Sequence, residues 1–315
     1  MPPMDALKEN MKRQYPSLFE NRIGKMPGQP AHLETDPTVI PIQRKHFPVP
    51  YCLIPSTQKK LTYLMMNDII EQVPEGANVT HISPMHPVEK ANYDPNHYKN
   101  RECEVHNRKR CRTCCSVGDM ETIDIRITSD NSNNLNKAII KQTRPMPSVC
   151  TLKYDLNGAK HFSKVDIRDA FLTVELDEES KDLTIFSTPW GLYRYKRLNM
   201  GLCVASELFQ EKMTRNLQGL VNVKVAMDDI LVFGKTQEEH DAALHALTKR
   251  LVDLNLTVGV DKCEFNKEEI VFYGMVISKH GIKPKQQKLD DFMNASIPSN
   301  NKEVKSFLSL ALYFQ

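Results

Sequence analysis

The sequence is 315 residues long, with 40% apolar residues, 26% charged residues and a formal net charge of +3. This composition excludes a disordered chain and is typical of a globular protein with two or three subdomains. The charge is too mild to establish a nucleic-acid partner, because a mixed-sign solvated surface accounts for it equally well.

Neither export nor membrane insertion is indicated by the sequence. No apolar run approaches the roughly 18 residues of a membrane-spanning helix, and Met1 to Tyr15 is polar. We therefore expect no membrane partner and no secretory signal, with a cytoplasmic location by default and nuclear residence left open.

The eight cysteines should then be reduced thiols, and Cys203 and Cys263 should pack as small apolar residues.

The first 72 residues predict two helices separated by an extended segment. A short polar helix comes first, and the prolines from Pro37 to Pro55 then favour an extended strap laid across another domain. From Gln58 to Gln72 the apolar residues have the spacing of an amphipathic helix. Its apolar positions are Leu61, Leu64, Met65 and Ile69.

A basic, cysteine-rich segment lies between Lys90 and Thr122. It contains five side chains that can bind a metal, namely Cys103, His106, Cys111, Cys114 and Cys115. One interpretation is a small zinc knuckle, but the segment has no second Cys-x-x-Cys, and we do not favour zinc. The other interpretation is an exposed basic insertion, and a nucleic-acid-binding module built around it is a third functional alternative.

Next along the chain, Phe162 to Phe171 predicts a short apolar strand that ends at Asp166. After it, Leu172, Val174 and Leu176 alternate with polar residues, which predicts a half-buried strand.

Two helices of the following region have recognisable starts. Ser206 can cap a helix with a core-facing stripe of Phe209, Met213 and Leu217. A capping box of Thr236 and Glu239 begins a second helix. Its leucine stripe consists of Leu244, Leu247, Leu251 and Leu254.

Residues 221–234, between these helices, read as two strands joined by a tight turn that carries Asp228 and Asp229. An isolated Asp-Asp pair is most often ordinary turn chemistry. The functional alternative is that the two carboxylates share a small volume with a cation, for which oxygen ligands favour Mg²⁺ or Mn²⁺. Two-metal phosphoryl transfer needs carboxylates that bridge ions about 3.5–4 Å apart, and these usually come from separate strands of one sheet. Asp166 would supply the third carboxylate.

Five blocks, in this order, resemble the successive blocks of a reverse transcriptase. They are Phe162–Leu176, Leu198–Leu202, Met227–Phe233, Lys262–Phe265 and Phe272–Gly274. Their spacing is most similar to that of the gypsy-like long-terminal-repeat retrotransposons, and the resemblance covers about residues 15 to 315.

The resemblance implies an α+β right-hand polymerase fold whose palm is an antiparallel sheet with helices on one face. In this scheme, residues 1–55 are the lead-in and 56–150 the fingers, with the cysteine-rich insertion at about 91–122. The palm takes 151–176 and 198–278, interrupted by a fingers hairpin at 177–197, and 279–315 begin a truncated thumb. Ile82–Met85 and Ile123–Ile127 should be paired finger strands, and Lys302–Leu308 a helix start.

The same resemblance implies an RNA-directed DNA polymerase that uses two Mg²⁺ or Mn²⁺ ions, a template-primer of RNA or DNA, and deoxynucleoside triphosphates. Asp166, Asp228, Asp229 and the backbone of Ile167 would hold the metals. The resemblance places two further sets of residues on the substrates. Nucleotide contacts fall on Arg126, Lys90, Phe171, Gly201 and Lys262, and primer contacts on Met227, Tyr273 and Gly274.

Two departures from the family keep an alternative open. Ala226 stands where much of the family carries Tyr, which implies altered primer positioning, and the Asn133-Asn134 region adds one residue. Together with the insertion and the short thumb, the extra residue favours a retroelement remnant that binds nucleic acid without polymerising, whereas the three aspartates favour the enzyme. The sequence leaves the oligomeric state open.

Overall fold

The computed structural model describes residues 3–89, 102–103, 108–109, 124–142, 154–295 and 297–312. The chain divides into two compact units. The first comprises Met1–Asn21, Pro145–Arg168 and Gln210–Gln315, and the second comprises Arg22–Arg144 and Asp169–Phe209. The domain boundaries expected from the sequence stay predictions.

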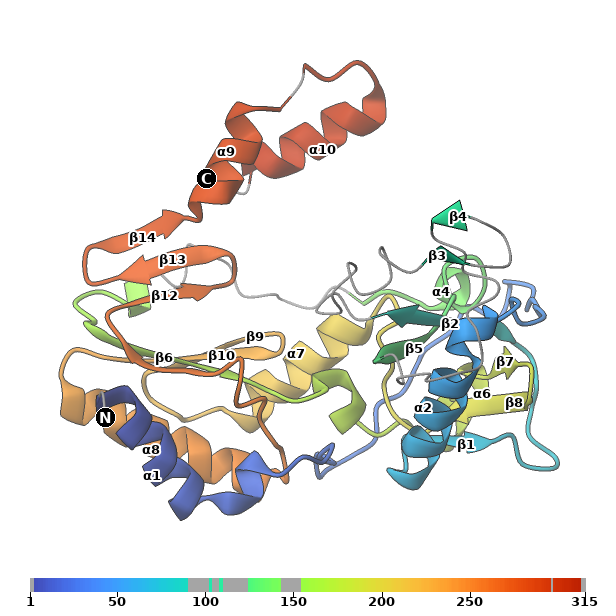
Figure 1. The fold of residues 1–315 in the computed structure, drawn as a ribbon, viewed down its shortest axis with the longest axis horizontal. Coiled ribbons are helices and arrows are strands. Elements are labelled where there is room, and N and C mark those ends of the chain that lie inside the picture. The colour runs from blue at the N-terminus through green and yellow to red at the C-terminus, as the bar shows by residue number, and fades with distance from the viewer. Residues whose placement is uncertain are drawn as a thin grey trace. The chain divides into compact units, whose positions relative to one another are not determined.

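The first unit is built on a four-stranded antiparallel sheet in the order β11-β6-β10-β9. The strands are β6 (His161–Asp166), β9 (Val223–Ala226), β10 (Asp229–Gly234) and β11 (Glu264–Lys267). Helices α1 (Pro3–Gln14) and α8 (Gln237–Asp253) lie on one side of this sheet, and η1 (Pro16–Phe19) follows α1 (Figure 1). The predicted antiparallel sheet with helices on one face is confirmed.

On the other side of this sheet lies a three-stranded antiparallel sheet, β12-β13-β14 (Figure 1). Its strands are β12 (Glu269–Phe272), β13 (Met275–Ser278) and β14 (Gly281–Pro284). Phe162 and Leu231 from the first sheet and Phe272 from the second are buried in one apolar cluster. Burying each such side chain contributes about 1.5–3 kcal/mol, so this cluster holds the two sheets together.

Two helices, α9 (Gln286–Met293) and α10 (Asn301–Leu312), end the described part of the first unit. Their Phe292 and Phe307 rings stack with centroids 5.4 Å apart. The helix expected from Lys302 onward is confirmed.

The second unit contains a five-stranded sheet in the order β1-β8-β7-β2-β5. Its strands are β1 (Ile70–Gln72), β2 (Ser83–Glu89), β5 (Ile125–Ser129), β7 (Phe186–Thr188) and β8 (Gly191–Tyr195). The helical elements of this unit are η2 (Tyr51–Leu53), α2 (Ile54–Met66), α4 (Leu135–Ala138), η3 (Ala170–Thr173) and α6 (Glu178–Leu183). β2 and β5 are antiparallel neighbours, so the two predicted strands do pair, and each runs beyond its predicted end. Helix α7 (Ala205–Asn216) begins in this unit and ends in the first, and β3 (Glu102–Cys103) pairs with β4 (Arg108–Lys109).

Three local predictions are wrong. The helix expected over Gln58–Gln72 ends at Met66, because Asp68 takes a left-handed φ of +57° and Ile70 pairs with Tyr195 in the sheet. Ser206 lies inside α7, which already begins at Ala205, and therefore does not cap it.

The third error is the strand expected from Leu172 to Leu176. The chain instead forms a 3₁₀ turn over Ala170–Thr173 that starts after Asp169, whose φ is +45°. Such a turn ends the extended conformation, so only isolated bridges remain, at Glu175 and Leu176.

The capping box at the start of α8 is only partly as predicted. Thr236 Oγ1 accepts from the Glu239 N–H at 3.3 Å, but the Glu239 carboxylate accepts from the N–H of Lys235 at 2.9 Å. Leu244, Leu247, Leu251 and Leu254 are buried as expected. Within the described residues, no helix is long and apolar enough to cross a membrane.

Helix α8 is tied to β6 through a fully buried histidine, His240. Its Nε2 lies 2.8 Å from Ser163 Oγ, and its Nδ1 lies 2.8 Å from the Asp241 carboxylate. Burial lowers the pKa of His240; the nearby His161 ring adds to this effect, whereas Asp241 opposes it. The neutral imidazole is therefore the form that the fold stabilises.

We expect His240 to make the protein less stable in mild acid. The pKa of His240 is lower in the folded than in the unfolded state. Its contribution to the free energy of unfolding is therefore complete above the unfolded-state pKa of about 6.5, and it is lost as pH falls through the folded-state pKa. Urea unfolding followed by circular dichroism between pH 8 and pH 5 should show this loss. In His240→Gln, which cannot titrate, the free energy of unfolding should fall less over that range. Equal pH dependence in both proteins would contradict the prediction.

Candidate active site

The hairpin expected from the sequence is formed by β9 and β10. Asp229 pairs with Ala226, so the connecting turn consists of Met227 and Asp228. The sequence predicted both aspartates in the turn, whereas Asp229 is already the first residue of β10. Met227 has a φ of +57°, and the Asp228 side chain is exposed at the tip.

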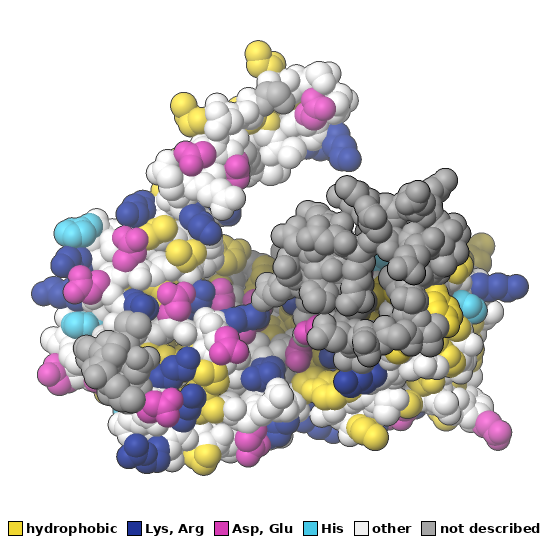
Figure 2. All heavy atoms as spheres, viewed as in Figure 1, with side chains coloured by type: hydrophobic (Ala, Val, Ile, Leu, Met, Phe, Trp, Pro, Cys, Tyr) yellow, Lys and Arg dark blue, Asp and Glu magenta, His cyan; other side chains and the backbone are white. Residues whose placement is uncertain are grey.

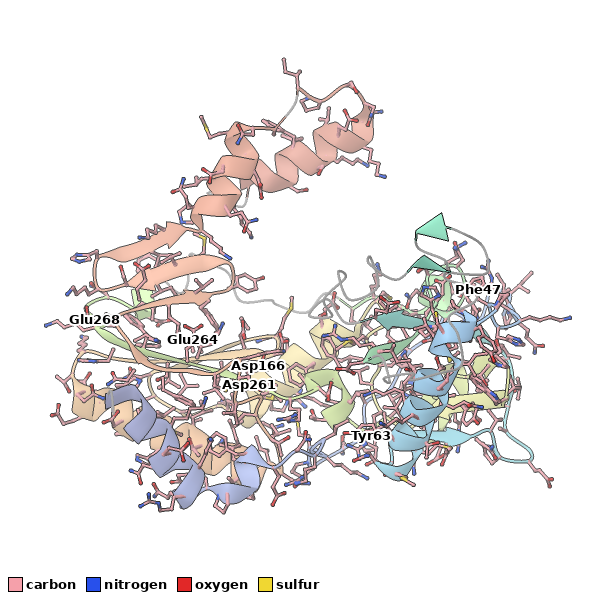
Figure 3. All side chains as sticks on the ribbon, viewed as in Figure 1. Phe47, Tyr63, Asp166, Asp261, Glu264 and Glu268 are labelled. Atoms are coloured by element: carbon pink, nitrogen blue, oxygen red, sulfur yellow. The ribbon has the colours of Figure 1, made fainter. Side chains whose placement is uncertain are left out.

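Strand β6 brings the third predicted aspartate to the same place. Asp166, which is labelled in Figure 3, is the last residue of β6. It pairs with Asp229 of β10. The N–H of Ile167 donates to the carbonyl of Asp228 at 3.0 Å, which ties the turn to the end of β6. The fold thus gathers Asp166, Asp228 and Asp229 at one end of the sheet.

The carboxylates disturb one another in this arrangement. Burial raises the pKa of Asp166, and the charge of Asp228 raises it further, although Lys262 and Lys164 oppose the shift. Burial likewise raises the pKa of Asp229, with Asp228 and Asp166 adding to the shift and Lys164 opposing it. Such crowding of like charges is what a bound cation would relieve.

Lys262 already supplies one positive charge at this place. Its Nζ lies 3.3 Å from both carboxylate oxygens of Asp166. The lysine side chain is 67% exposed and the aspartate side chain 8% exposed, so the ammonium reaches from solvent to a nearly buried carboxylate. The sequence resemblance predicted Lys262 as a nucleotide contact, and its ion pair with Asp166 was not foreseen.

The turn that carries Lys262 lies against the end of β6. Gly259 N–H donates to the carbonyl of Asp166 at 2.9 Å, and Asp166 N–H donates to Cys263 Sγ at 3.4 Å. A Cβ on Gly259 would lie 3.0 Å from Asp166 Oδ1. Cys263 is half-buried, and burial raises the pKa of its thiol to about 11.

The donor chemistry of the three aspartates fits Mg²⁺ or Mn²⁺, because hard cations bind carboxylate oxygens. Within the described ranges, however, no three carboxylate, imidazole or thiol groups converge closely enough to hold an ion as they stand. The ammonium of Lys262 contacts one of the three carboxylates instead.

Gln210 of α7 is a residue that the sequence analysis missed. Its side chain is buried, its Oε1 accepts from Met227 N–H at 2.7 Å, and its Nε2 donates to the carbonyl of Val225 at 3.1 Å. The sequence signal was hidden, because the helical pattern singled out only the apolar stripe beside it.

Three of the predicted nucleotide contacts belong to the second unit. Arg126 is exposed on β5, and Phe171 packs edge-to-face on Phe209 with ring centroids 5.6 Å apart. A Cβ on Gly201 would lie 2.7 Å from the Ser129 carbonyl, so the fold itself needs glycine there. Their roles toward a nucleotide stay predictions.

The predicted primer contacts lie in the first unit. Tyr273 and Gly274 form the two-residue turn between β12 and β13, with φ of +50° and +76°. These angles are typical of a type I′ hairpin turn. Met227 is in the β9–β10 turn, next to Ala226, which is buried in the apolar cluster between the two sheets. Contact of these residues with a primer stays a prediction.

The predictions at Lys90 and at the side chains of Cys103, His106, Cys111, Cys114 and Cys115 lie outside the described residues. On the face seen in Figure 2, lysine and arginine side chains are interspersed with aspartate and glutamate side chains. This mixture fits the mixed-sign surface expected from the small net charge.

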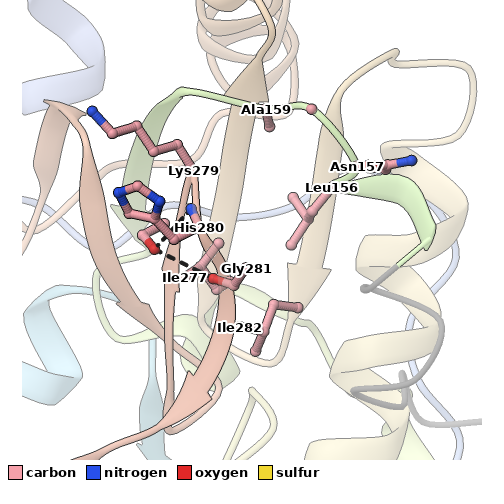
Figure 4. A pocket seen from close by; sticks show the side chains of 10 residues that line it. Leu156, Asn157, Ala159, Ile277, Lys279, His280, Gly281 and Ile282 are labelled. Atoms are coloured by element: carbon pink, nitrogen blue, oxygen red, sulfur yellow. Dashed lines mark hydrogen bonds between the residues drawn. The ribbon is translucent and has the colours of Figure 1, made fainter.

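A pocket of about 370 Å³ lies beside the segment that immediately precedes β6 (Figure 4). It is lined by Leu156 and Ala159 on one side and by the β13–β14 hairpin on the other. His280 N–H donates to Ser278 Oγ at 3.3 Å within that hairpin. None of the predicted site residues lines this pocket.

Comparison with known proteins gives a consistent answer. The family described as reverse transcriptase (RNA-dependent DNA polymerase) matches residues 119–277, about half of the chain. The chain is 35% identical over 183 residues to the retrovirus-related Pol polyprotein from transposon 297 of Drosophila melanogaster, covering 58% of this chain and 17% of that protein. It is 31% identical over 183 residues to the retrovirus-related Pol polyprotein from transposon gypsy of the same organism, covering 58% and 18%. The chain spans about a fifth of the length of such relatives.

Among solved structures, the chain is similar to the foamy viral protease-reverse transcriptase in complex with double-stranded DNA. The TM-score is 0.73 at 20% identity, and the match covers 96% of this chain and 48% of that one. The same viral protein in complex with an RNA/DNA hybrid gives a TM-score of 0.70. These likenesses confirm the predicted α+β right-hand polymerase fold.

Proposed function

This chain belongs to the reverse transcriptase (RNA-dependent DNA polymerase) family and is of the gypsy-like long-terminal-repeat retrotransposon type, and we propose that it extends a primer with deoxynucleotides on an RNA or DNA template. The observation that carries the proposal is the position of Asp166 opposite Asp229 and beside Asp228 at one end of an antiparallel sheet. The proposed substrates are deoxynucleoside triphosphates and a template-primer.

In this proposal, Asp166, Asp228 and the backbone of Ile167 hold two divalent ions, and Asp229 shapes the site from the neighbouring strand. When bound, the ions would lower the pKa of the primer 3′-hydroxyl and stabilise the negative charge on the leaving pyrophosphate. Asp166 is central, because its nearly buried carboxylate lies on β6 while the other two carboxylates come from the hairpin.

The Lys262 ammonium has a separate role in this proposal. While it pairs with Asp166, it offsets the repulsion among the three carboxylates. A phosphate group that arrives with the nucleotide would offer the same ammonium a second anionic partner, in keeping with the predicted nucleotide contact.

The test is primer extension by the purified chain on a primed RNA template, with Mg²⁺ and then with Mn²⁺. Incorporation of deoxynucleotides in a metal-dependent manner would support the proposal. A folded chain that binds the primer-template and incorporates nothing would favour the alternative, a remnant that binds nucleic acid without polymerising.

Replacing Lys262 with methionine should tighten Mn²⁺ binding. The substitution removes a positive charge that competes for Asp166, and one like charge near a protein surface is worth about 1 kcal/mol or more, so the dissociation constant should fall about three- to tenfold. Titration of Mn²⁺ followed by electron paramagnetic resonance measures this constant directly.

Lys283→Met is the matched control for that measurement. Lys283 is 65% exposed and pairs with Glu269 at 3.3 Å, whereas Lys262 is 67% exposed with a pair of the same length. The two variants lose the same charge, and only Lys262 contacts Asp166. Unchanged or weaker Mn²⁺ binding in Lys262→Met would show that its ammonium does not compete for the site.

A further inference from the structure

The side chain of Gln210 makes three hydrogen bonds in the interior of the first unit. Gln210 is 3% exposed. Its Oε1 accepts from Met227 N–H at 2.7 Å, and its Nε2 donates to the Val225 carbonyl at 3.1 Å and to Thr214 Oγ1 at 3.0 Å. One buried amide group therefore contacts the backbone on both sides of Ala226.

The backbone held in this way is the strained part of the catalytic hairpin. Met227 has a φ of +57°, a left-handed conformation that an L-residue other than glycine rarely adopts. Strain of this kind persists only where surrounding contacts hold it. The contact to Met227 N–H is such a restraint, and it acts on the residue that immediately precedes Asp228.

A second restraint acts on the other side of the turn. The Asp228 carbonyl accepts from Ile167 N–H at 3.0 Å, so Asp228 is fixed to β6 by its own backbone. Gln210 fixes the chain before it and Ile167 fixes the chain after it. Between them, these contacts set the direction in which the exposed Asp228 side chain leaves the turn.

We propose that Gln210 is a positioning residue for Asp228, which it serves by holding the Val225–Met227 backbone in the conformation that aims the carboxylate at the metal site. This inference rests on the proposed function. Gln210 itself contacts neither the carboxylates nor Lys262 in any hydrogen bond of the described residues, so its effect is transmitted through the turn.

The alternative is that Gln210 only satisfies buried polar groups and stabilises the fold. The two roles differ in their consequences. A purely stabilising residue would lower the melting temperature when replaced, but Mn²⁺ binding by the folded fraction would not change. A positioning residue would weaken Mn²⁺ binding and increase local hydrogen exchange in protein that remains folded.

The test compares Gln210→Met with Thr214→Val, both in the full chain. Gln210→Met keeps the length of the side chain and removes all three hydrogen bonds, whereas Thr214→Val removes only the bond on the helix side and leaves both turn contacts. In Gln210→Met we expect Mn²⁺ affinity to fall about tenfold, the value for losing one well-made bond to a buried backbone group. Amide hydrogen exchange of a peptide that contains Met227 and Asp228 should become at least tenfold faster, while Thr214→Val stays close to the parent.

Gln210→Glu keeps the proposal testable if Gln210→Met does not fold. It retains an oxygen that can accept from Met227 N–H and removes the donor to Val225, so its loss of Mn²⁺ affinity should be smaller than that of Gln210→Met. Mn²⁺ affinity and turn exchange equal to the parent in folded Gln210 variants would overturn the proposal.

Failure of the proposed function gives a different pattern of results. A chain that never extends a primer, yet shows weaker Mn²⁺ binding and faster turn exchange in Gln210→Met, would refute the polymerase and retain the positioning role. A chain that extends a primer at an unchanged single-turnover rate in Gln210→Met would retain the polymerase and refute the positioning role.

Discussion

Replacing Asp228 with asparagine should lower primer extension by about three orders of magnitude or more. In two-metal catalysis the ions contribute several kcal/mol to stabilisation of the transition state, and each 1.36 kcal/mol is about a tenfold change in rate. An amide is neutral and a weaker ligand for a hard cation, so Asp228→Asn removes one of the charges that would hold the metal.

This substitution should leave the fold intact. The Asp228 side chain is exposed at the tip of the hairpin, and the backbone of Asp228 is held through its carbonyl by Ile167 N–H. Asparagine preserves both features. A loss of activity can then be assigned to chemistry if the circular dichroism spectrum and the melting temperature match those of the parent chain.

Asp261→Asn is the matched control for the same assay. Asp261 is an exposed aspartate in the turn after Gly259, one residue from Lys262, and it is not among the three predicted ligands. The same change of charge there should alter extension by less than about threefold, the scale of a surface charge effect. Equal losses of primer extension in the two variants would mean that the total negative charge near the site matters, and not ligation by Asp228. Full activity in Asp228→Asn would refute the assignment of Asp228 as a ligand.

The β9–β10 hairpin could be predicted from the sequence because its information is local. The alternating valines before Met227 and the apolar run after Asp229 define two short strands, and few residues remain for the turn. What the sequence did not show is register. The pairing of Asp229 with Asp166 joins positions far apart in the chain, and a shift of one residue would turn the two side chains to opposite faces.

Two of the three local errors have a common cause, which is backbone conformation that side-chain patterns do not report. Asp68 and Asp169 both have positive φ, and each lies where a predicted regular element fails. At Asp68 a predicted helix stops, and after Asp169 a predicted strand is replaced by a 3₁₀ turn. The spacing of apolar residues predicted neither the helix end at Asp68 nor the 3₁₀ turn after Asp169.

Gln210 could not be recognised from sequence for a different reason. It follows Phe209 in a helix whose apolar stripe faces the core, and a glutamine at such a position is ordinarily solvated. Its importance depends on tertiary contacts with Val225 and Met227, which lie beyond the helix. Lys262 is a similar case, because its ion pair with Asp166 requires the turn at Gly259 to fold back on β6.

The second large effect is expected from Gly234→Ala at the end of β10. A Cβ at this position would lie 2.4 Å from the backbone nitrogen of His240 and 2.8 Å from its Cα. Real Cβ atoms do not come so close to backbone, so either β10 or the first turn of α8 would have to move. Gly234 is also fixed on its other side, since its carbonyl accepts from Lys160 N–H at 2.9 Å.

We expect this substitution to lower the free energy of unfolding by about 3 kcal/mol, the upper part of the range for overpacking a well-packed site. The melting temperature should fall by roughly 6–12 °C. The strain falls on the end of β10 that pairs with His161 and on the helix that holds His240 against Ser163.

Gly219→Ala separates this clash from the general effect of losing a glycine. Gly219 has a φ of +87°, and a Cβ added there would meet no atom within 4 Å, so alanine costs only its strained backbone conformation, about 1–2 kcal/mol. Gly234 has no positive φ, so its loss should come from the collision alone. Thermal unfolding followed by circular dichroism should therefore rank Gly234→Ala below Gly219→Ala and both below the parent. The reverse order would mean that α8 can move away from β10 without loss of stability.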